Sequence, residues 1–559
     1  MSDISSNNKS QSAPGTGGPP MVFSMPMFRR CIPEALRPWI YVILAFCYQF
    51  SNGMYLGAMN NVIGERGIMR EDVQMCLYAT LVGMAIYFPL LFRMKFRFSN
   101  KLLLMTSAAV IAVCQFLCIL PIPLPVIWGL CVVCGMAKIQ GTFECMSTIQ
   151  LWMTPKRDFG VFFPLLHIIL LTSIEVTGYL AAWFAYDMHW TLMHWLVMGL
   201  MLFVLLIQGL LTRPFHAVPK IVPLAGIDWI GALLWLAFFL QTAWMLNFGD
   251  WLDWWNSQTF RLVCGTSLIN LAFCLQRMWY RPQAFYEPAM WGYRYFIPII
   301  LLIGVVEALF SVEHVLEMVY YEEVMHYEDH TYELLNQWSL IGIWAGCFFT
   351  LGWLRLMRWN VYKLIAIALG IFCLYVGGFY VLIDANLNIE SLIWPLIFRG
   401  FSYSVLCISL MWCLHSIMSF EHFFQALSMF NILHMYVGGL IGAALHARGL
   451  KYYVGDTFAR CSQYVDSVRM SASSHDFQLI MSRFVEGALA QSIKILFGWT
   501  LIAGIFFTLL MFLWDIPMVR RQVKHIPSWP KVGIGVWLRY RRWMRRHNQR
   551  KTSRTAFPV

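Results

Sequence analysis

Residues 191–211 read TLMHWLVMGLMLFVLLIQGLL, a stretch that contains no Asp, Glu, Lys or Arg. A helix of about 20 apolar residues is long enough to cross the hydrocarbon core of a bilayer. In lipid, a helix satisfies its backbone hydrogen bonds within itself, whereas an irregular chain leaves them unpaired. This stretch therefore predicts a membrane-spanning helix.

Comparable stretches recur along almost the whole chain. Of its 559 residues, 59% are hydrophobic and 13% are charged, whereas soluble domains carry about 25% charged residues. This composition excludes an ordinary soluble protein and predicts an all-α, polytopic membrane protein. About fourteen transmembrane helices are expected, at residues 37–58, 73–92, 102–120, 125–150, 160–184, 191–211, 227–247, 261–277, 295–317, 335–354, 363–383, 392–415, 426–447 and 490–514.

The distribution of Lys and Arg predicts the orientation, because short cytoplasmic loops are enriched in these residues. Alternate short loops are basic, and the loops between them, at 121–125, 185–190, 248–260 and 384–391, contain neither residue. Both termini are therefore predicted to be cytoplasmic, with the acidic segment 320–333 and the long polar loop 448–490 on the other face. The basic loops carry Arg93, Lys95, Arg97, Lys101, Lys156, Arg157, Arg213, Lys220, Arg281, Arg294, Arg355 and Arg358.

The two tails differ in composition. Residues 1–36 begin with a Ser-, Gly-, Pro- and Asn-rich stretch and are expected to be a disordered cytoplasmic tail. Residues 516–559 form a basic cytoplasmic tail and contribute much of the formal net charge of +12. Basic segments next to a membrane bind anionic lipid head groups, so the charge predicts membrane lipids as partners and not nucleic acid.

Several ionisable residues lie inside the predicted spans, where a charged side chain costs about 2.5–3.5 kcal/mol on insertion scales. Glu144 and Glu175 lie in consecutive spans and are expected to share a water-filled cavity. A carboxyl group buried there could bind and release a proton. Other candidates for proton coupling or for the substrate cavity are Lys138, His167 and Arg399, together with the amides Gln49 and Asn52.

Each candidate also has a structural interpretation. A buried glutamate could form an ion pair with Lys138 or Arg399 on another helix. The amides of Gln49 and Asn52 could hydrogen-bond between helices instead of lining a cavity. Glu307 and Glu313 add two more acids within the span at 295–317.

Enzymatic signatures are absent from the sequence. It contains no GxxxxGK[ST], HExxH or GxSxG pattern, each of which is tied to a catalytic arrangement. The spacing of acids and histidines in 320–333 matches no closed metal site. We therefore expect no catalytic residues, no cofactor, no metal site and no enzyme activity.

A resemblance to a known family begins at Ile227, where the chain reads IDWIGALL. With the KIQG stretch at 138–141, PKRDFG at 155–160 and the GGLIG glycines at 438–442, it resembles the 14-span drug:proton antiporters of the major facilitator superfamily, the EmrB/QacA type. The resemblance covers about residues 37–515. It identifies the structural motif residues as Asp228, Gly231, Gly438, Gly439 and Gly442.

This resemblance implies the major facilitator fold, with two six-helix bundles at 37–212 and 295–515 and two extra helices within 213–294. It also implies a carrier in the inner, or cytoplasmic, membrane that exports hydrophobic or amphipathic small molecules in exchange for protons. A periplasmic adaptor and an outer-membrane channel are the protein partners expected of such a carrier. The family's acidic residue of the first span is Asn52 here, which leaves Glu144 and Glu175 as the candidate proton sites.

Two alternatives remain open on the residues alone. One is a carrier for another substrate class, such as a lipid, a siderophore or a metabolite. The other is a non-transporting membrane scaffold or sensor, in which the departures from the family pattern mark a lost activity.

Overall fold

The computed structural model describes residues 25, 27–50, 58–154, 158–216, 224, 227–281, 283–357, 360–384, 387–462 and 474–513. Over these ranges the chain is helical, with one isolated β-bridge between Phe28 and Thr212. The prediction of an all-α polytopic membrane protein is confirmed. The basic tail predicted at 516–559 lies outside the described residues.

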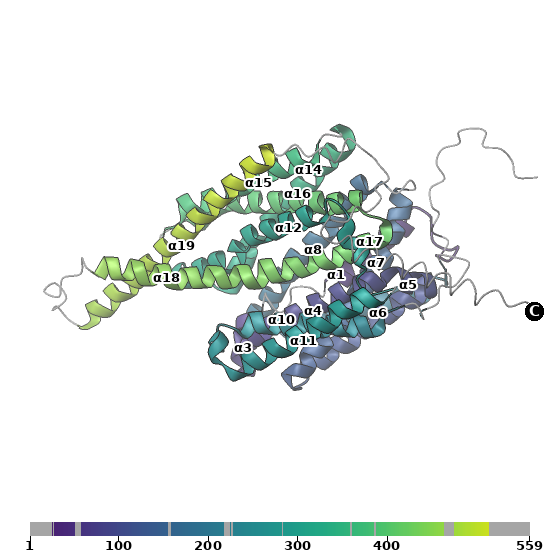
Figure 1. The fold of residues 1–559 in the computed structure, drawn as a ribbon, viewed down its shortest axis with the longest axis horizontal. Helices are drawn as coiled ribbons and strands as arrows, with labels where there is room; N and C mark the ends of the chain where they lie inside the picture. The colour runs from purple at the N-terminus through teal and green to yellow at the C-terminus, as the bar shows by residue number, and fades with distance from the viewer. Residues whose placement is uncertain are drawn as a thin grey trace, which may run out of the picture.

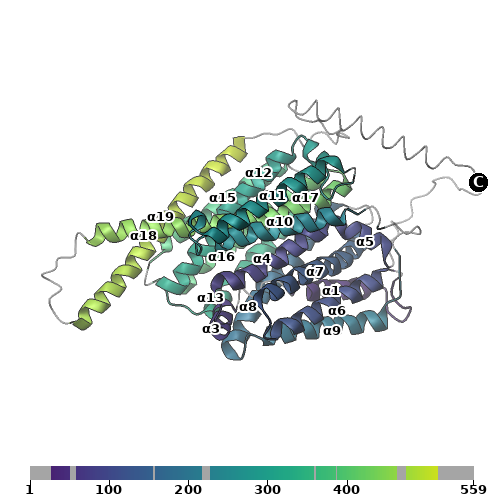
Figure 2. The ribbon, with the colours of Figure 1, turned by 60° about the horizontal axis from the view of Figure 1, so that its bottom comes forward.

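Helices of the first part of the chain lie together, and those of the last part form a second group beside them (Figures 1 and 2). The first group comprises α1 (Arg37–Gln49), α3 (Met59–Arg66), α4 (Arg70–Tyr87), α5 (Leu91–Arg97), α6 (Asn100–Ile119), α7 (Leu124–Met153), α8 (Phe159–Asp187) and α9 (Leu192–Leu211). Two helices follow, α10 (Trp229–Phe248) and α11 (Gln258–Tyr280). The second group comprises α12 (Phe296–Phe310), η5 (Glu313–Glu317), η6 (Tyr320–Val324), α13 (Asp329–Asn336), α14 (Ser339–Leu351), η7 (Gly352–Met357), α15 (Val361–Leu382), α16 (Ile393–Ile417), α17 (Phe420–Leu433), η9 (His434–Gly442), α18 (Ala443–Ser462) and α19 (Ser474–Leu513).

Thirteen helices within the described ranges are long and apolar enough to cross a membrane. They correspond in order to the second through the fourteenth predicted spans. The first predicted span, 37–58, is described as a helix only over Arg37–Gln49, so a count of fourteen stays a prediction. Many large apolar and aromatic side chains are exposed on both helix groups, among them Leu206, Leu301 and Trp394, which suits a surface that contacts a membrane.

Close packing of α4 against α7 depends on two glycines. A Cβ atom at Gly83 would lie 2.1 Å from the carbonyl oxygen of Val132, and one at Gly135 would lie 2.1 Å from that of Thr80. Each helix therefore presents a glycine to the backbone of the other. Small residues at such crossings allow helix backbones in membranes to approach closely.

The same arrangement recurs between α14 and α16. A Cβ atom at Gly342 would lie 1.9 Å from the carbonyl oxygen of Ile397, and one at Gly400 would lie 2.2 Å from that of Ser339. In each of the four helices, the glycine lies three positions after the residue whose carbonyl oxygen faces the glycine of the other helix. The two helix groups thus contain one repeated packing unit.

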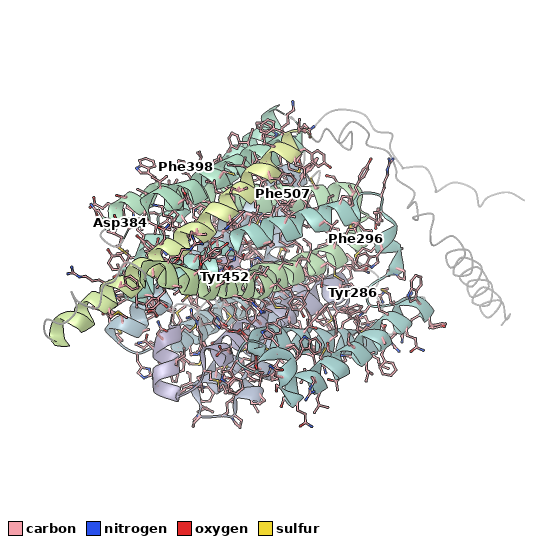
Figure 3. The ribbon with its side chains drawn as sticks, turned by 60° about the vertical axis from the view of Figure 1, so that its left-hand side comes forward. Tyr286, Phe296, Asp384, Phe398, Tyr452 and Phe507 are labelled. Carbon is pink, nitrogen blue, oxygen red and sulfur yellow. The ribbon has the colours of Figure 1, made fainter. Side chains whose placement is uncertain are left out.

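In the region predicted as a long polar loop, 448–490, the described residues are helical. α18 contains 20 residues and α19 contains 40, which corresponds to a length of about 60 Å for α19. The two helices pair through Phe458 and Phe484, whose ring centroids are 5.1 Å apart, and through Trp499, which donates a 3.0 Å hydrogen bond to the Tyr453 hydroxyl. They project beyond the other helices as a hairpin (Figure 2), with exposed Tyr452 on α18 (Figure 3).

The end of the predicted N-terminal tail is packed, in contrast to the disorder expected through residue 36. Met25, Met27 and Phe28 are buried, and the Phe28 ring lies edge-on to Tyr41 with centroids 5.3 Å apart. The backbone N–H of Arg213 donates to the carbonyl of Met27 over 2.7 Å. Apolar side chains in this short segment and its backbone pairing with the end of α9 explain why it is ordered.

Candidate functional site

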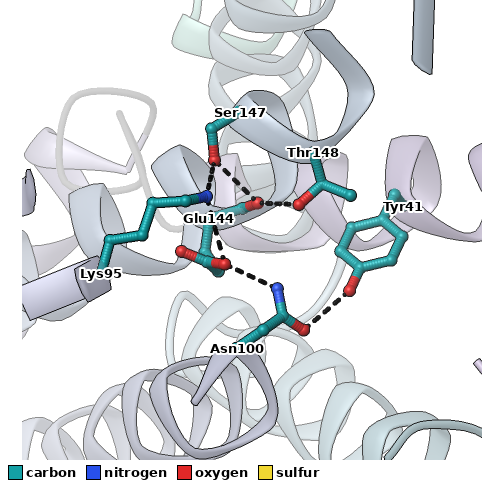
Figure 4. A network of polar contacts seen from close by, with 6 residues as sticks. All are labelled: Tyr41, Lys95, Asn100, Glu144, Ser147 and Thr148. Carbon is teal, nitrogen blue, oxygen red and sulfur yellow. Dashed lines mark hydrogen bonds and ion pairs between the residues drawn. The ribbon is translucent and has the colours of Figure 1, made fainter. Parts of the chain in front are cut away.

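Glu144 on α7 lies in a buried polar network (Figure 4). Its Oε1 atom is 3.3 Å from the Lys95 ammonium and accepts a 2.6 Å hydrogen bond from the Asn100 side chain. The side-chain amide oxygen of Asn100 accepts a 2.8 Å hydrogen bond from the Tyr41 hydroxyl, and Lys95 also donates to the Ser147 hydroxyl over 2.5 Å. The charge of Glu144 is therefore balanced by a lysine from α5.

This network adjoins an aromatic cluster between the two helix groups. The Lys95 ammonium lies 5.5 Å from the centroid of the Phe143 ring. Phe424 on α17 packs edge-on against both Phe92 and Phe143, with centroids 4.4 and 5.4 Å apart. The geometry indicates that Lys95 and Glu144 support a contact between the groups at the predicted cytoplasmic end.

A second buried network is centred on Arg399 in α16. Its Nη1 atom is 2.7 Å from Glu317 and 3.4 Å from Glu313, and its Nη2 atom donates to the Asn336 amide oxygen over 3.1 Å. Glu317 also accepts a hydrogen bond from the Tyr375 hydroxyl. Arg399 and Glu317 are almost fully buried, whereas the Glu313 side chain is 27% exposed.

Two further acids adjoin this network from α8 and α13. Glu175 interacts electrostatically with Arg399 and Glu313, and Glu333 interacts with Glu175. Gln337 donates a 3.1 Å hydrogen bond to the backbone carbonyl of Glu175, which holds α8 next to the start of α14. We call Glu175, Glu313, Glu317, Glu333 and Arg399 the Arg399 cluster.

Glu144 and Glu175 have separate surroundings. The partners of Glu144 lie on α1, α5, α6 and α7, whereas Glu175 faces α13, α14 and Arg399. The expected shared cavity therefore has no support in the described contacts. Consecutive spans predict adjacent helices, but the direction in which each carboxyl group points depends on packing.

Lys138 on α7 and His167 on α8 lie within the first helix group and belong to neither network. Lys138 is fully buried, and its ammonium has no hydrogen-bond partner among the described atoms. Nδ1 of buried His167 is 2.8 Å from the carbonyl oxygen of Phe163, one turn earlier on α8. His167 is thus satisfied by its own helix.

Of the two polar candidates in the first span, Gln49 and Asn52, the structure describes Gln49. Gln49 is buried and donates a 3.0 Å hydrogen bond to the Thr142 hydroxyl on α7. Gln49 therefore makes a hydrogen bond between helices, which was the alternative to lining a cavity. Asn52 lies outside the described residues.

The contacts of Asp228 give the DWIG sequence at 228–231 a structural role. Its side chain caps α10 by accepting from the Gly231 backbone N–H over 3.1 Å, and it binds Arg277 of α11 through contacts of 2.7 and 2.8 Å. Arg281 is 3.3 Å away. A Cβ atom at Gly231 would lie 2.2 Å from the Asp228 carboxylate, so a larger residue there would displace the carboxylate. One carboxylate therefore starts α10 and joins it to α11.

Replacement of Asp228 by alanine is expected to destabilise the α10–α11 pair by about 2–3 kcal/mol, because the cap is lost and two arginines lose their counterion. Hydrogen exchange in the first turn of α10 measures the effect. The matched control is Asp250→Ala, since the ion pair of Asp250 with Lys451 is exposed and exposed pairs contribute about 0–1 kcal/mol. Equal protection of α10 in both variants would contradict the assignment.

The span 13 glycines pack against α12 and α4. A Cβ atom at Gly438 would lie 3.1 Å from Glu307, and one at Gly442 would lie 2.3 Å from Ser311 Cβ. Gly439 accepts a 3.1 Å hydrogen bond from the Tyr78 hydroxyl at its carbonyl. Close helix packing accounts for all three glycines.

Sequence reasoning did not single out Glu317, Glu333 or Lys95 as site residues. Glu313 and Glu317 are four positions apart, which places both on one helical face, and this spacing was the available signal. No local signal connects Lys95 with Glu144, because they are 49 residues apart in the sequence.

No family of known proteins matches the chain in a scan of family models, and no curated protein matches it in sequence. Solved structures match it at the level of the fold. A mutant of the peptide transporter POT in complex with alafosfalin is 12% identical with a TM-score of 0.54, and the match covers 88% of this chain and 96% of that chain.

Two other structures match over similar lengths. One, described as giving insight into substrate recognition in proton dependent oligopeptide transporters, is 12% identical with a TM-score of 0.51 and coverages of 87% and 99%. A mutant of the nucleoside transporter NupG is 13% identical with a TM-score of 0.50 and coverages of 85% and 99%. At these identities the similarity shows the fold alone, which is the major facilitator fold.

Proposed function

We propose that this chain is a transporter that couples the movement of a hydrophobic or amphipathic small molecule to protons. Its fold, shared with structures described as peptide and nucleoside transporters, supports transport as the general activity. The observation that carries proton coupling is the Arg399 cluster, in which four carboxyl groups surround one arginine.

Charge balance within this cluster supports proton binding. One guanidinium neutralises one carboxylate, and in the described part of the chain no ion pair joins Glu175 or Glu317 to a second Lys or Arg. Isolated charges in a medium of low polarity are costly, so the remaining carboxyl groups are stabilised when they bind protons. Of these, Glu313 and Glu175 are partly accessible, whereas Glu317 is fully buried.

The cluster also spans the boundary between the two helix groups. Glu175 comes from α8, while the other members come from the second group. Transporters of this architecture alternate access by rocking one bundle against the other. Protonation of Glu175 would change its attraction to Arg399 and so the contact between the bundles. Glu144, already paired with Lys95, is assigned a structural role.

The resemblance extends this proposal to export from the cytoplasm across an inner membrane. A periplasmic adaptor and an outer-membrane channel remain proposed partners, and the projecting α18–α19 hairpin is the element suited to meet an adaptor. A carrier for lipids, siderophores or other metabolites is the alternative that substrate tests must separate.

Proton coupling is tested with protein reconstituted in vesicles that carry a pH gradient. A fluorescent amphipathic dye, a dipeptide and a nucleoside serve as probe substrates. Glu175→Gln and Glu313→Gln are each expected to slow gradient-driven transport at least about tenfold, because a bound proton can no longer be exchanged. Exchange of labelled for unlabelled substrate without a gradient should continue.

Glu390→Gln is the matched control, since Glu390 is an exposed acid outside the cluster. Unchanged gradient-driven transport in both cluster variants would contradict the proton assignment. If no probe moves in response to the gradient with the parent protein, the scaffold alternative is favoured over transport.

A further inference from the structure

A row of acids leads from the predicted extracytoplasmic face to the Arg399 cluster. Asp329 and Glu333 lie one turn apart on α13, about 6 Å along the helix axis and on the same face. α13 packs beside the outer part of α8 and near α3 (Figure 2). The acidic segment 320–333 is therefore continuous with the cluster and is not simply a solvated loop.

The contacts of Glu333 connect the two ends of this row. A Cβ atom at Gly178 of α8 would lie 3.2 Å from Glu333 Oε2, so the glycine gives the carboxylate room against the helix. The charged groups that act on Glu333 are Glu175, Arg399 and Asp329. Asp329 accepts hydrogen bonds of 3.0 and 3.2 Å from Asn60 of α3. Its other charged neighbours are Arg70, Glu322 and Glu328.

Tyr321 provides a second, independent observation. Its side chain is fully buried and interacts electrostatically with Glu317 and Arg399, yet its hydroxyl has no hydrogen-bond partner among the described atoms. Buried polar groups in proteins are nearly always hydrogen-bonded, and an exception marks a place for a water molecule or a ligand. The inner end of the row therefore has a donor available for such a group.

Aromatic contacts join α13 to α8 beside this row. His330 on α13 stacks on Tyr186 of α8 with ring centroids 5.2 Å apart and lies 6.0 Å from Tyr179. These rings bridge the two helices that carry Glu333 and Glu175. This packing keeps the carboxyl groups of the row on adjoining helices.

We propose that Asp329 and Glu333 form the route by which protons reach Glu175 and the Arg399 cluster from the predicted extracytoplasmic face. Asp329 attracts protons from water at the outer end, and Glu333 binds one and passes it to Glu175, which becomes neutral as Glu333 regains its charge. Intramembrane carboxylates act in this way in proton relays. The inference rests on the proposed proton coupling and assigns its access path.

The test uses the full chain in vesicles with a pH-sensitive dye inside and the three probe substrates named above. Glu333→Gln is expected to slow substrate-linked proton uptake from the α13 side about tenfold, because the intermediate proton acceptor is lost. Asp329→Asn is expected to shift the half-maximal rate to a higher proton concentration on that side. Substrate exchange without a gradient should stay within about twofold of the parent, since it needs no net proton movement.

Glu390→Gln again serves as the control on the same predicted face, and Glu333→Asp should restore proton uptake. Proton uptake equal to the parent in both Glu333→Gln and Asp329→Asn would overturn the route. Equal slowing of proton uptake and substrate exchange would also overturn it, because that result indicates a structural role. Absence of substrate exchange in the parent would instead refute the proposed transport function.

Discussion

Replacing Arg399 with methionine is expected to destabilise the protein by about 3–5 kcal/mol and to abolish transport, because the change leaves buried carboxylates without a counterion. Glu317 is fully buried at 2.7 Å from the guanidinium, so it loses its main charge partner. The measurement is reversible unfolding in detergent, monitored by the loss of helical signal.

A double-mutant cycle with Glu317→Gln separates this effect from general misfolding. The glutamine removes the charge and keeps a polar group near the Tyr375 hydroxyl. The double variant should therefore be more stable than Arg399→Met alone. Strictly additive costs would show that the two side chains do not interact.

Gly342→Ala is expected to destabilise the protein by about 1–3 kcal/mol or more, because overpacking a close contact forces backbone shifts. The added Cβ would lie 1.9 Å from the Ile397 carbonyl oxygen. Since the obstacle is backbone, α14 and α16 must separate for the methyl group to fit. The free energy of unfolding in detergent measures the loss.

Gly135→Ala tests the equivalent contact between α4 and α7, where the Cβ would lie 2.1 Å from the Thr80 carbonyl oxygen. Gly199→Ala is the matched control in α9, because nothing lies within 4 Å of its Cβ position. The control should be neutral or more stable by about 0.5–1 kcal/mol, as alanine favours helix over glycine. Similar losses in all three variants would refute the repeated packing unit.

The thirteen described helices that can cross a membrane were predictable, because each depends on a local property, the length of an apolar run. Asp228 and Gly231 were identified through the resemblance of the DWIG sequence, whereas the pairing of Asp228 with Arg277 of α11 is a tertiary contact. Apolar runs did not predict the packing of the segment that contains Met25, Met27 and Phe28, or the length of the projecting α18–α19 hairpin. Both depend on contacts between residues far apart in the sequence, such as Arg213 with Met27 in the segment and Trp499 with Tyr453 in the hairpin.

The sequence identified only part of the candidate site, and it did not predict which side chains pair. Glu175 and Arg399 were both identified as costly residues inside spans. Glu144 was grouped with Glu175, although its partner is Lys95, a residue assigned to a basic loop. Glu317 and Glu333 were not singled out, because their significance depends on the position of Arg399.

By itself, the sequence determined that this chain crosses a membrane many times as helices, and it marked the charged residues that needed partners in that setting. Backbone hydrogen bonding in lipid and the length of apolar runs are enough for this result. Only the tertiary structure decided which charges meet. Glu317 and Arg399 are separated by 82 residues, and long-range helix packing, which includes glycine contacts such as that of Gly342 with Ile397, brings their side chains together.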